Sequence, residues 1–152
     1  MIATAVVVLV LVALNSTMTI VLRNQRDSAN QQQATKYGQE AVEWMRKFRD
    51  NAGWATFYAT VNAAATKCMK AVPTTVDAVG YNGATMKNGA CTLQTVNLSD
   101  IITGDSNGFT RDVASTVVGA AQDDIRVLVT VRWIDGSRTL TATTTIELRK
   151  WK

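Results

Sequence analysis

The chain contains no histidine among its 152 residues. This absence excludes Ser-His and Cys-His catalytic pairs and removes the most common metal ligand. The two cysteines, Cys68 and Cys91, form no CxxC motif, so a catalytic or metal-binding cysteine is not indicated. The aspartates are scattered through apparent loops and strand ends. We therefore expect a non-enzyme with no catalytic residue, metal, cofactor or small-molecule substrate.

Charge is absent from the first part of the chain. Met1 to Leu22 carries no charged side chain, and neither glycine nor proline occurs before Gly38. As a helix this segment would reach about 33 Å at ~1.5 Å per residue, enough to cross the ~30 Å core of a bilayer. It is either a membrane anchor or a helix that packs into a protein filament. Its large apolar side chains, the candidates for packing in a filament core, are Ile2, Val6, Val7, Val8, Leu9, Val10, Leu11, Val12, Leu14, Met18, Ile20, Val21 and Leu22.

The first positive charges create a conflict over orientation. Arg23 and Arg26 follow the apolar segment, and the positive-inside rule alone would place the C-terminal part in the cytoplasm. That part is rich in threonine and holds two lone cysteines, which is typical of domains outside the cell. The conflict disappears if a short basic leader once preceded the chain and was removed, and we expect this.

An amphipathic pattern follows a polar stretch at positions 23–33. Ala34, Tyr37, Ala41, Trp44, Met45 and Phe48 recur at three- and four-residue spacing, which predicts a helix with one buried stripe. Tyr37, Ala41, Trp44, Met45 and Phe48 are the candidates for packing against a head domain. The helix should end at positions 50–53, where Gly53 can take a left-handed cap. The sequence therefore predicts one helix of about 50 residues, with 1–22 as its transmembrane or filament-core part, 23–52 as its amphipathic continuation and 53–152 as a globular head.

The middle of the chain gives weaker signals. The run WATFYATV from Trp54 is typical of a short helix or a strand, positions 63–69 read as weakly helical, and positions 70–89 read as a loop. A Cys68–Cys91 disulfide would close a loop of about 24 residues and add ~3 kcal/mol in the chain-entropy model. Two free buried thiols are the alternative.

The C-terminal third predicts antiparallel strands. Apolar residues alternate over positions 124–133, Asp135-Gly136 is typical of a hairpin turn, and positions 138–148 read as the return strand with a row of outward threonines. Positions 109–118 predict a preceding strand, joined to the next by a turn at 119–124, and positions 91–96 an edge strand. The expected fold class is α+β, with a long N-terminal helix packed on an antiparallel meander.

Four features together resemble a known family. They are the apolar N-terminal helix, its continuation QQQATKYGQEAVEWMRKFRDNAGW, the cysteine pair, and the terminal hairpin DDIRVLVTVRWIDGSRTLTATTTIELRKW. The chain is similar to type IV pilins and to the pseudopilins of type II secretion. It departs from that family in having Ala5 where a glutamate is usual at the fifth mature position, and in lacking the proline that commonly kinks the helix. Either the first family residues are missing, or the filament forms without that glutamate.

The resemblance implies a pilin-like structural subunit. Such a chain sits in the inner membrane, is extracted by pilus assembly machinery, and polymerises with itself into an extracellular filament that serves adhesion, surface motility or DNA uptake. The alternatives are a minor pilin or pseudopilin, and a monomeric membrane-anchored extracellular adhesion domain. A net charge of +4 gives mild attraction to a host-cell surface or to DNA. Because the chain has no long Lys/Arg run and no nucleic-acid motif, we interpret this charge mainly as a solvated surface. Asn97 begins an Asn-Leu-Ser acceptor pattern for N-glycosylation.

Overall fold

The computed structural model describes the backbone of residues 2–62, 66–82, 85–93, 100–105, 107–118 and 123–150, and the side chains in these ranges except those of residues 2–16 and 82. By its internal contacts the chain divides into two units, Met1–Gln33 and Ala34–Lys152, which are described separately below. The elements in order are α1 (Ile2–Ala52), α2 (Trp54–Asn62), β1 (Thr66–Met69), α3 (Ala78–Asn82), β2 (Met86–Asn88), β3 (Thr110–Val118), β4 (Asp124–Asp135) and β5 (Arg138–Arg149). This element order confirms the expected α+β class.

The predicted helix is confirmed in extent and in its end. Helix α1 runs to Ala52, and Gly53 follows it with a φ of 75°. A side chain would be strained at this left-handed position, so the glycine lets the chain turn directly into α2. The run from Trp54, for which helix and strand both stood open, is helical in α2.

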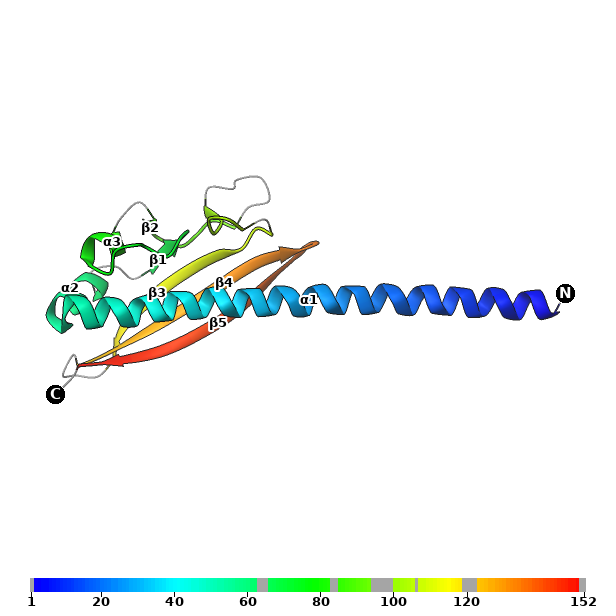
Figure 1. Ribbon diagram of the computed structural model, residues 1–152, viewed down its shortest axis with the longest axis horizontal. Coiled ribbons are helices and arrows are strands. Elements are labelled where there is room, and N and C mark those ends of the chain that lie inside the picture. Colours follow the sequence, from blue (N-terminus) through cyan, green and yellow to red (C-terminus); the bar gives the residue numbers. More distant parts are fainter. Residues whose placement is uncertain are drawn as a thin grey trace. The chain divides into compact units, whose positions relative to one another are not determined.

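The second unit is built on a five-stranded antiparallel sheet of order β2-β1-β3-β4-β5 (Figure 1). The alternation predicted for β4 is confirmed, because Ile125, Val127, Val129, Val131 and Trp133 are buried while Arg126 and Leu128 are exposed. On β5, Thr139, Thr141, Thr143 and Thr145 form the exposed row that the sequence predicts. One face of the sheet is therefore apolar and buried, and the other is exposed to solvent.

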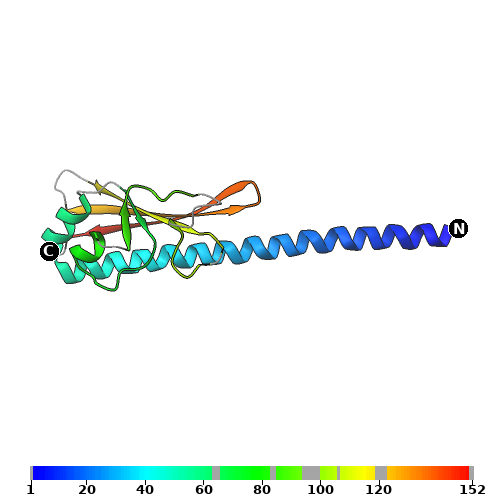
Figure 2. The same ribbon diagram turned by 90° about the horizontal axis from the view of Figure 1, so that it is seen from above.

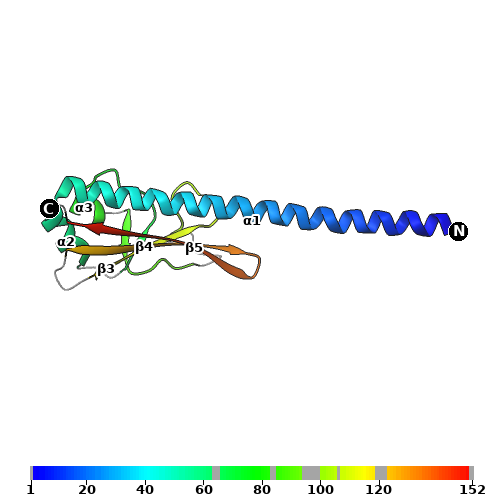
Figure 3. The same cartoon turned by 90° about the horizontal axis from the view of Figure 1, so that it is seen from below.

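The amphipathic stripe of α1 forms the core with the buried face of the sheet. Ala41, Met45 and Phe48 are fully buried and belong to one cluster with Val127 and Val129. Figure 3 shows the corresponding part of α1 lying along β5. A Cβ at Gly38 would come within 2.8 Å of the Thr144 hydroxyl oxygen on β5, so the absent side chain allows this close approach.

Helices α2 and α3 close one end of this core. Figure 2 shows them next to the last turns of α1; α2 lies against β3 and α3 against β2. Tyr81 of α3 is fully buried and stacks on Phe48 and Trp44, and Phe57 of α2 meets the Phe48 ring edge-on. This aromatic cluster joins α1, α2 and α3 at their contact point.

Four expectations from the sequence are corrected. The helical prediction for 63–69 is wrong over Thr66–Met69, which is strand β1, and the supposed loop at 70–89 contains α3 and β2. The predicted edge strand at 91–96 is wrong over Cys91–Leu93, which form no strand, and residues 94–96 lie outside the described part; the edges of the sheet are β2 and β5. The hairpin turn is Gly136-Ser137, one residue later than predicted, since Asp135 pairs with Arg138. For β1 and β2, pairing between segments distant in the sequence overrides a weak local preference. In the hairpin, Gly136 takes a positive φ of 61° as the first of the two loop residues. Of the turn predicted at 119–124, residues 119–122 lie outside the described part, and Asp124 is the first residue of β4.

The contact at Gly38 gives a direct test of the packing between α1 and β5. In a Thr144→Ala background, Gly38→Ala should stabilise the unit by about 1 kcal/mol, because alanine is the better helix former. With Thr144 present the same substitution should gain less or destabilise, since the new Cβ meets the threonine hydroxyl. The measurement is thermal unfolding of the full chain in mild detergent, followed by near-ultraviolet circular dichroism. Equal effects in both backgrounds would contradict the packing.

Candidate functional site

The described part of the Met1–Gln33 unit presents an uncovered apolar helix surface. Met18, Ile20, Val21 and Leu22 are 67%, 60%, 47% and 54% exposed. The other exposed large apolar side chains of the described residues, Val72, Val79 and Leu128, are isolated from one another in sequence. A group of neighbouring exposed apolar residues is typical of a surface that binds another molecule. These four residues form the described part of the candidate assembly surface.

The remaining candidates for that surface are Ile2, Val6–Val12 and Leu14. Their backbone is helical, as expected, and their side chains lie outside the described part. Among the residues that are described, no helix combines the length and the apolar character needed to span a membrane. The membrane or filament-core role of 1–22 stays a prediction.

The predicted packing residues of α1 lie in the core of the second unit. Trp44 is 3% exposed and its indole N–H donates to the carbonyl oxygen of Thr75 at 3.0 Å. Tyr37 is half-buried, meets the Phe109 ring edge-on, and donates its hydroxyl to Asp105. The stripe therefore contacts both the sheet and the loops that follow α2.

A buried arginine, which no local pattern in the sequence singles out, also ties α1 to the sheet. Arg111 of β3 is fully buried, and its Nη1 donates to the carbonyl oxygen of Tyr37 at 2.9 Å and lies 3.5 Å from a Glu40 carboxylate oxygen. Burial lowers the pKa of Arg111, and the Glu40 charge opposes this shift. Arg111 stands between Thr110 and Asp112, and no local pattern marks it, because only the tertiary fold brings it to α1.

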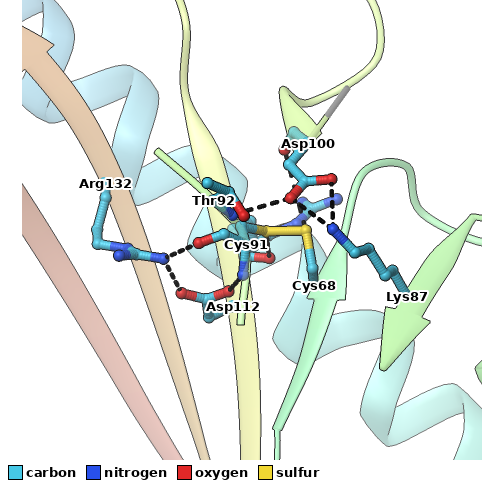
Figure 4. Close-up of polar contacts among 8 residues, drawn as sticks. Cys68, Lys87, Cys91, Thr92, Asp100, Asp112 and Arg132 are labelled. Atoms are coloured by element: carbon cyan, nitrogen blue, oxygen red, sulfur yellow. Dashed lines mark hydrogen bonds and ion pairs between the residues drawn. A yellow bond between two sulfur atoms is a disulfide. The ribbon is translucent and has the colours of Figure 1, made fainter. Parts of the chain in front are cut away.

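The disulfide predicted between Cys68 and Cys91 is confirmed, with a Cα–Cα distance of 4.7 Å. Two carboxylates hold the segment after the bridge (Figure 4). Asp112 accepts the Cys91 N–H at 2.6 Å and an Arg132 N–H at 2.5 Å, and Arg132 also donates to the Cys91 carbonyl oxygen at 2.7 Å. The bridge is thus fixed to β3 and β4 on one side.

Asp100 holds the other side of the same segment. Its carboxylate accepts the Thr92 N–H at 2.8 Å and the Lys87 ammonium at 2.9 Å, and it is almost fully buried (Figure 4). These two hydrogen bonds, with the Thr92 backbone as the larger cause, lower the pKa of Asp100. Asp100 was predicted only as one of several scattered loop acids, because its partners are distant in the sequence.

One group of potential metal ligands occurs among the described residues. Cys68, Cys91 and Asp112 place their ligand atoms within 4.8 Å of one another. Both sulfurs are bound to each other, so neither can act as a thiolate ligand while the bridge is intact. With the disulfide intact, these three residues fix the backbone at Cys91 and offer no thiolate to a metal ion.

A groove of about 460 Å³ lies between α1 and the loop at residues 72–76. Its apolar lining includes Trp44, Val72, Pro73 and Val76. Its rim carries the charged side chains of α1 that lie along one stripe, Lys36, Glu40, Glu43 and Lys47. Two acids therefore stand between two lysines along this edge of the groove.

No protein-family model, no curated protein and no solved structure matches this chain. Asn97, the candidate glycosylation site, lies outside the described residues.

Removal of the disulfide should destabilise the second unit. The Cys68→Ala/Cys91→Ala variant should lose about 3 kcal/mol, because the unfolded chain regains the freedom of the closed loop. Urea unfolding of the full chain in detergent measures the loss. Reduced wild-type chain serves as the matched control and should unfold at the same urea concentration as the variant. A variant as stable as the oxidised wild type would contradict this role.

The Asp100 site should make stability depend on pH in the acid range. Because the folded pKa of Asp100 is lowered, its contribution is present above the unfolded value of about 3.9 and disappears as the pH falls through the folded value. Asp100→Asn should therefore cost about 1–3 kcal/mol at pH 7. The difference from wild type should shrink below pH 4 in unfolding experiments. A difference that is constant from pH 7 to pH 3 would contradict the assignment.

Proposed function

We propose that this chain is the structural subunit of an extracellular type IV pilus-like filament. The observation that carries the proposal is the run of exposed apolar residues on α1, which continues the uncharged segment that begins at Met1. Such a surface is stable in lipid or against other apolar helices. In water this surface is unfavourable, because removing apolar area from water lowers the free energy by about 25 cal/mol for each Å².

Neighbouring copies of the chain offer a matching cover. Each copy carries the same apolar helix, so lipid can be replaced by equivalent helices when the chain leaves the membrane. Contacts between different surfaces of identical subunits that do not close into a ring produce an open helical filament. The arrangement of a long helix followed by an antiparallel sheet is consistent with such an assembly.

The disulfide supports a location outside the cytoplasm. Disulfides persist in oxidising compartments, and Cys68–Cys91 fixes a surface loop of the second unit. The proposal therefore places the chain in the inner membrane first, with its second unit outside, and then in a filament on the cell surface. The filament would present the sheet-bearing units to other cells, surfaces or DNA.

A charge placed in the apolar segment tests this function. Val8→Asp or Val10→Asp should abolish pelletable fibres, because an aspartate in a packed helical core has no water and no partner. Val79→Asp is the matched control, since Val79 is 73% exposed on α3 and should tolerate the charge. Fibres sheared from cells are counted by negative-stain microscopy, and thermal unfolding checks that the second unit stays folded.

Normal fibres from the Val8→Asp chain would refute a core role for the helix. A wild-type chain that stays monomeric in detergent-solubilised membranes, with no fibres on the cells, would refute the filament itself.

A further inference from the structure

The groove beside α1 has features that fit one segment of a second copy of this chain. Its rim acids, Glu40 and Glu43, are three residues apart on the helix. Arg23 and Arg26 are also three residues apart and lie directly after the exposed apolar run. We propose that the groove of one copy receives positions 17–27 of α1 of a neighbouring copy, with the two arginines facing the two glutamates. This inference rests on the proposed filament function and names the contact within it.

The arginines are available for such a contact. Both side chains are exposed, and neither forms an ion pair with a residue in the described ranges. Arg26 shares one helix face with Leu22 and Thr19, because these positions differ by four and seven residues. The same side of the segment therefore carries an apolar residue for the groove wall and a charge for its rim.

The glutamates can exchange their present partners at small cost. Glu43 pairs with Arg46 on the same helix turn, and both side chains are about half exposed. Exposed pairs of this kind contribute little to stability. Glu40 keeps its side chain 38% exposed although one oxygen faces Arg111. Each carboxylate can accept an incoming guanidinium.

The apolar parts also match. Val72, which is 37% exposed, forms one wall of the groove with Pro73 and Val76. A volume of about 460 Å³ is in the range of sites that enclose a few side chains. Leu22 and Met18, one turn apart on the incoming helix, supply apolar side chains that are otherwise exposed.

The spacing fixes the axial offset between neighbours. Glu40 follows Arg23 by 17 residues, and Glu43 follows Arg26 by the same 17. Subunits of one polar filament run parallel, so matching both pairs requires a shift of about 26 Å along the helix, at ~1.5 Å per residue. Each copy offers arginines to one neighbour and glutamates to another, so the contact propagates.

Engineered cysteines test the offset in assembled fibres. In the Arg26→Cys/Glu43→Cys chain the two thiols of one copy lie about 26 Å apart on one helix, far beyond the ~7 Å Cα limit of a disulfide. Oxidation should therefore yield an intermolecular ladder on non-reducing gels. Arg26→Cys/Asp50→Cys is the matched control, because Asp50 lies on the same helix stripe about 10 Å further along. It should yield no ladder.

The outcomes separate this inference from the filament proposal. Normal fibres of the Arg26→Cys/Glu43→Cys chain that give no ladder, or equal ladders in both variants, would overturn the inference and leave the filament standing. Absence of fibres from the wild-type chain would overturn both.

A charge exchange covers the case in which the cysteine variant fails to assemble. Arg26→Glu and Glu43→Arg should each raise the unpolymerised fraction severalfold, because each places like charges together. The Arg26→Glu/Glu43→Arg chain should return toward the wild-type fraction, since opposite charges face each other again. A double variant that assembles no better than either single variant would contradict the pairing.

Discussion

The apolar surface of α1 must be shielded from water, and the rest of the structure depends on this requirement. From Ala34 to Phe48 the helix carries one apolar stripe, which the second unit buries completely at Ala41, Met45 and Phe48. The strands alternate so that Val127 and Val129 join the same core cluster, and Gly38 lacks a side chain where Thr144 of β5 comes close to the helix. In the Met1–Gln33 unit, the described apolar residues Met18 to Leu22 have no such cover. The proposal that other copies supply it follows from this difference.

Polar contacts give the second unit its specific arrangement. Hydrophobic burial alone would allow α1 to slide on the sheet, whereas buried Arg111 reaches one particular carbonyl oxygen, that of Tyr37. Asp112 and Asp100 act similarly on the loop beyond Cys91, each binding one backbone N–H and one cationic side chain. Removing one partner of such a buried pair would leave a charge without compensation. A different loop, at residues 72–76, forms one wall of the groove and is tied to α1 by the hydrogen bond from the Trp44 indole N–H to the Thr75 carbonyl oxygen.

The sequence predicted the parts of the fold whose signals are local and long. The helix stripe, the hairpin of β4 and β5 and the cysteine pair each rest on a repeated pattern or a rare residue. Strands β1 and β2 could not be predicted, because Thr66–Met69 and Met86–Asn88 are too short to show a period and owe their form to pairing with each other and, for β1, with β3. The roles of Arg111, Asp100 and Asp112 were equally hidden, since their partners lie 8 to 74 residues away in sequence. The sequence alone predicted the apolar run as a candidate assembly surface. The groove and the charged residues along it became visible only in the structure.

The most direct test of the account is a cryo-electron microscopy reconstruction of fibres sheared from cells that express the chain. The account predicts a filament in which α1 of every copy lies around the axis, with its Met1–Leu22 segment packed against equivalent helices. The sheets should lie at the surface. A filament with α1 exposed at its periphery, or preparations that contain the chain only as detergent-bound monomers, would contradict it.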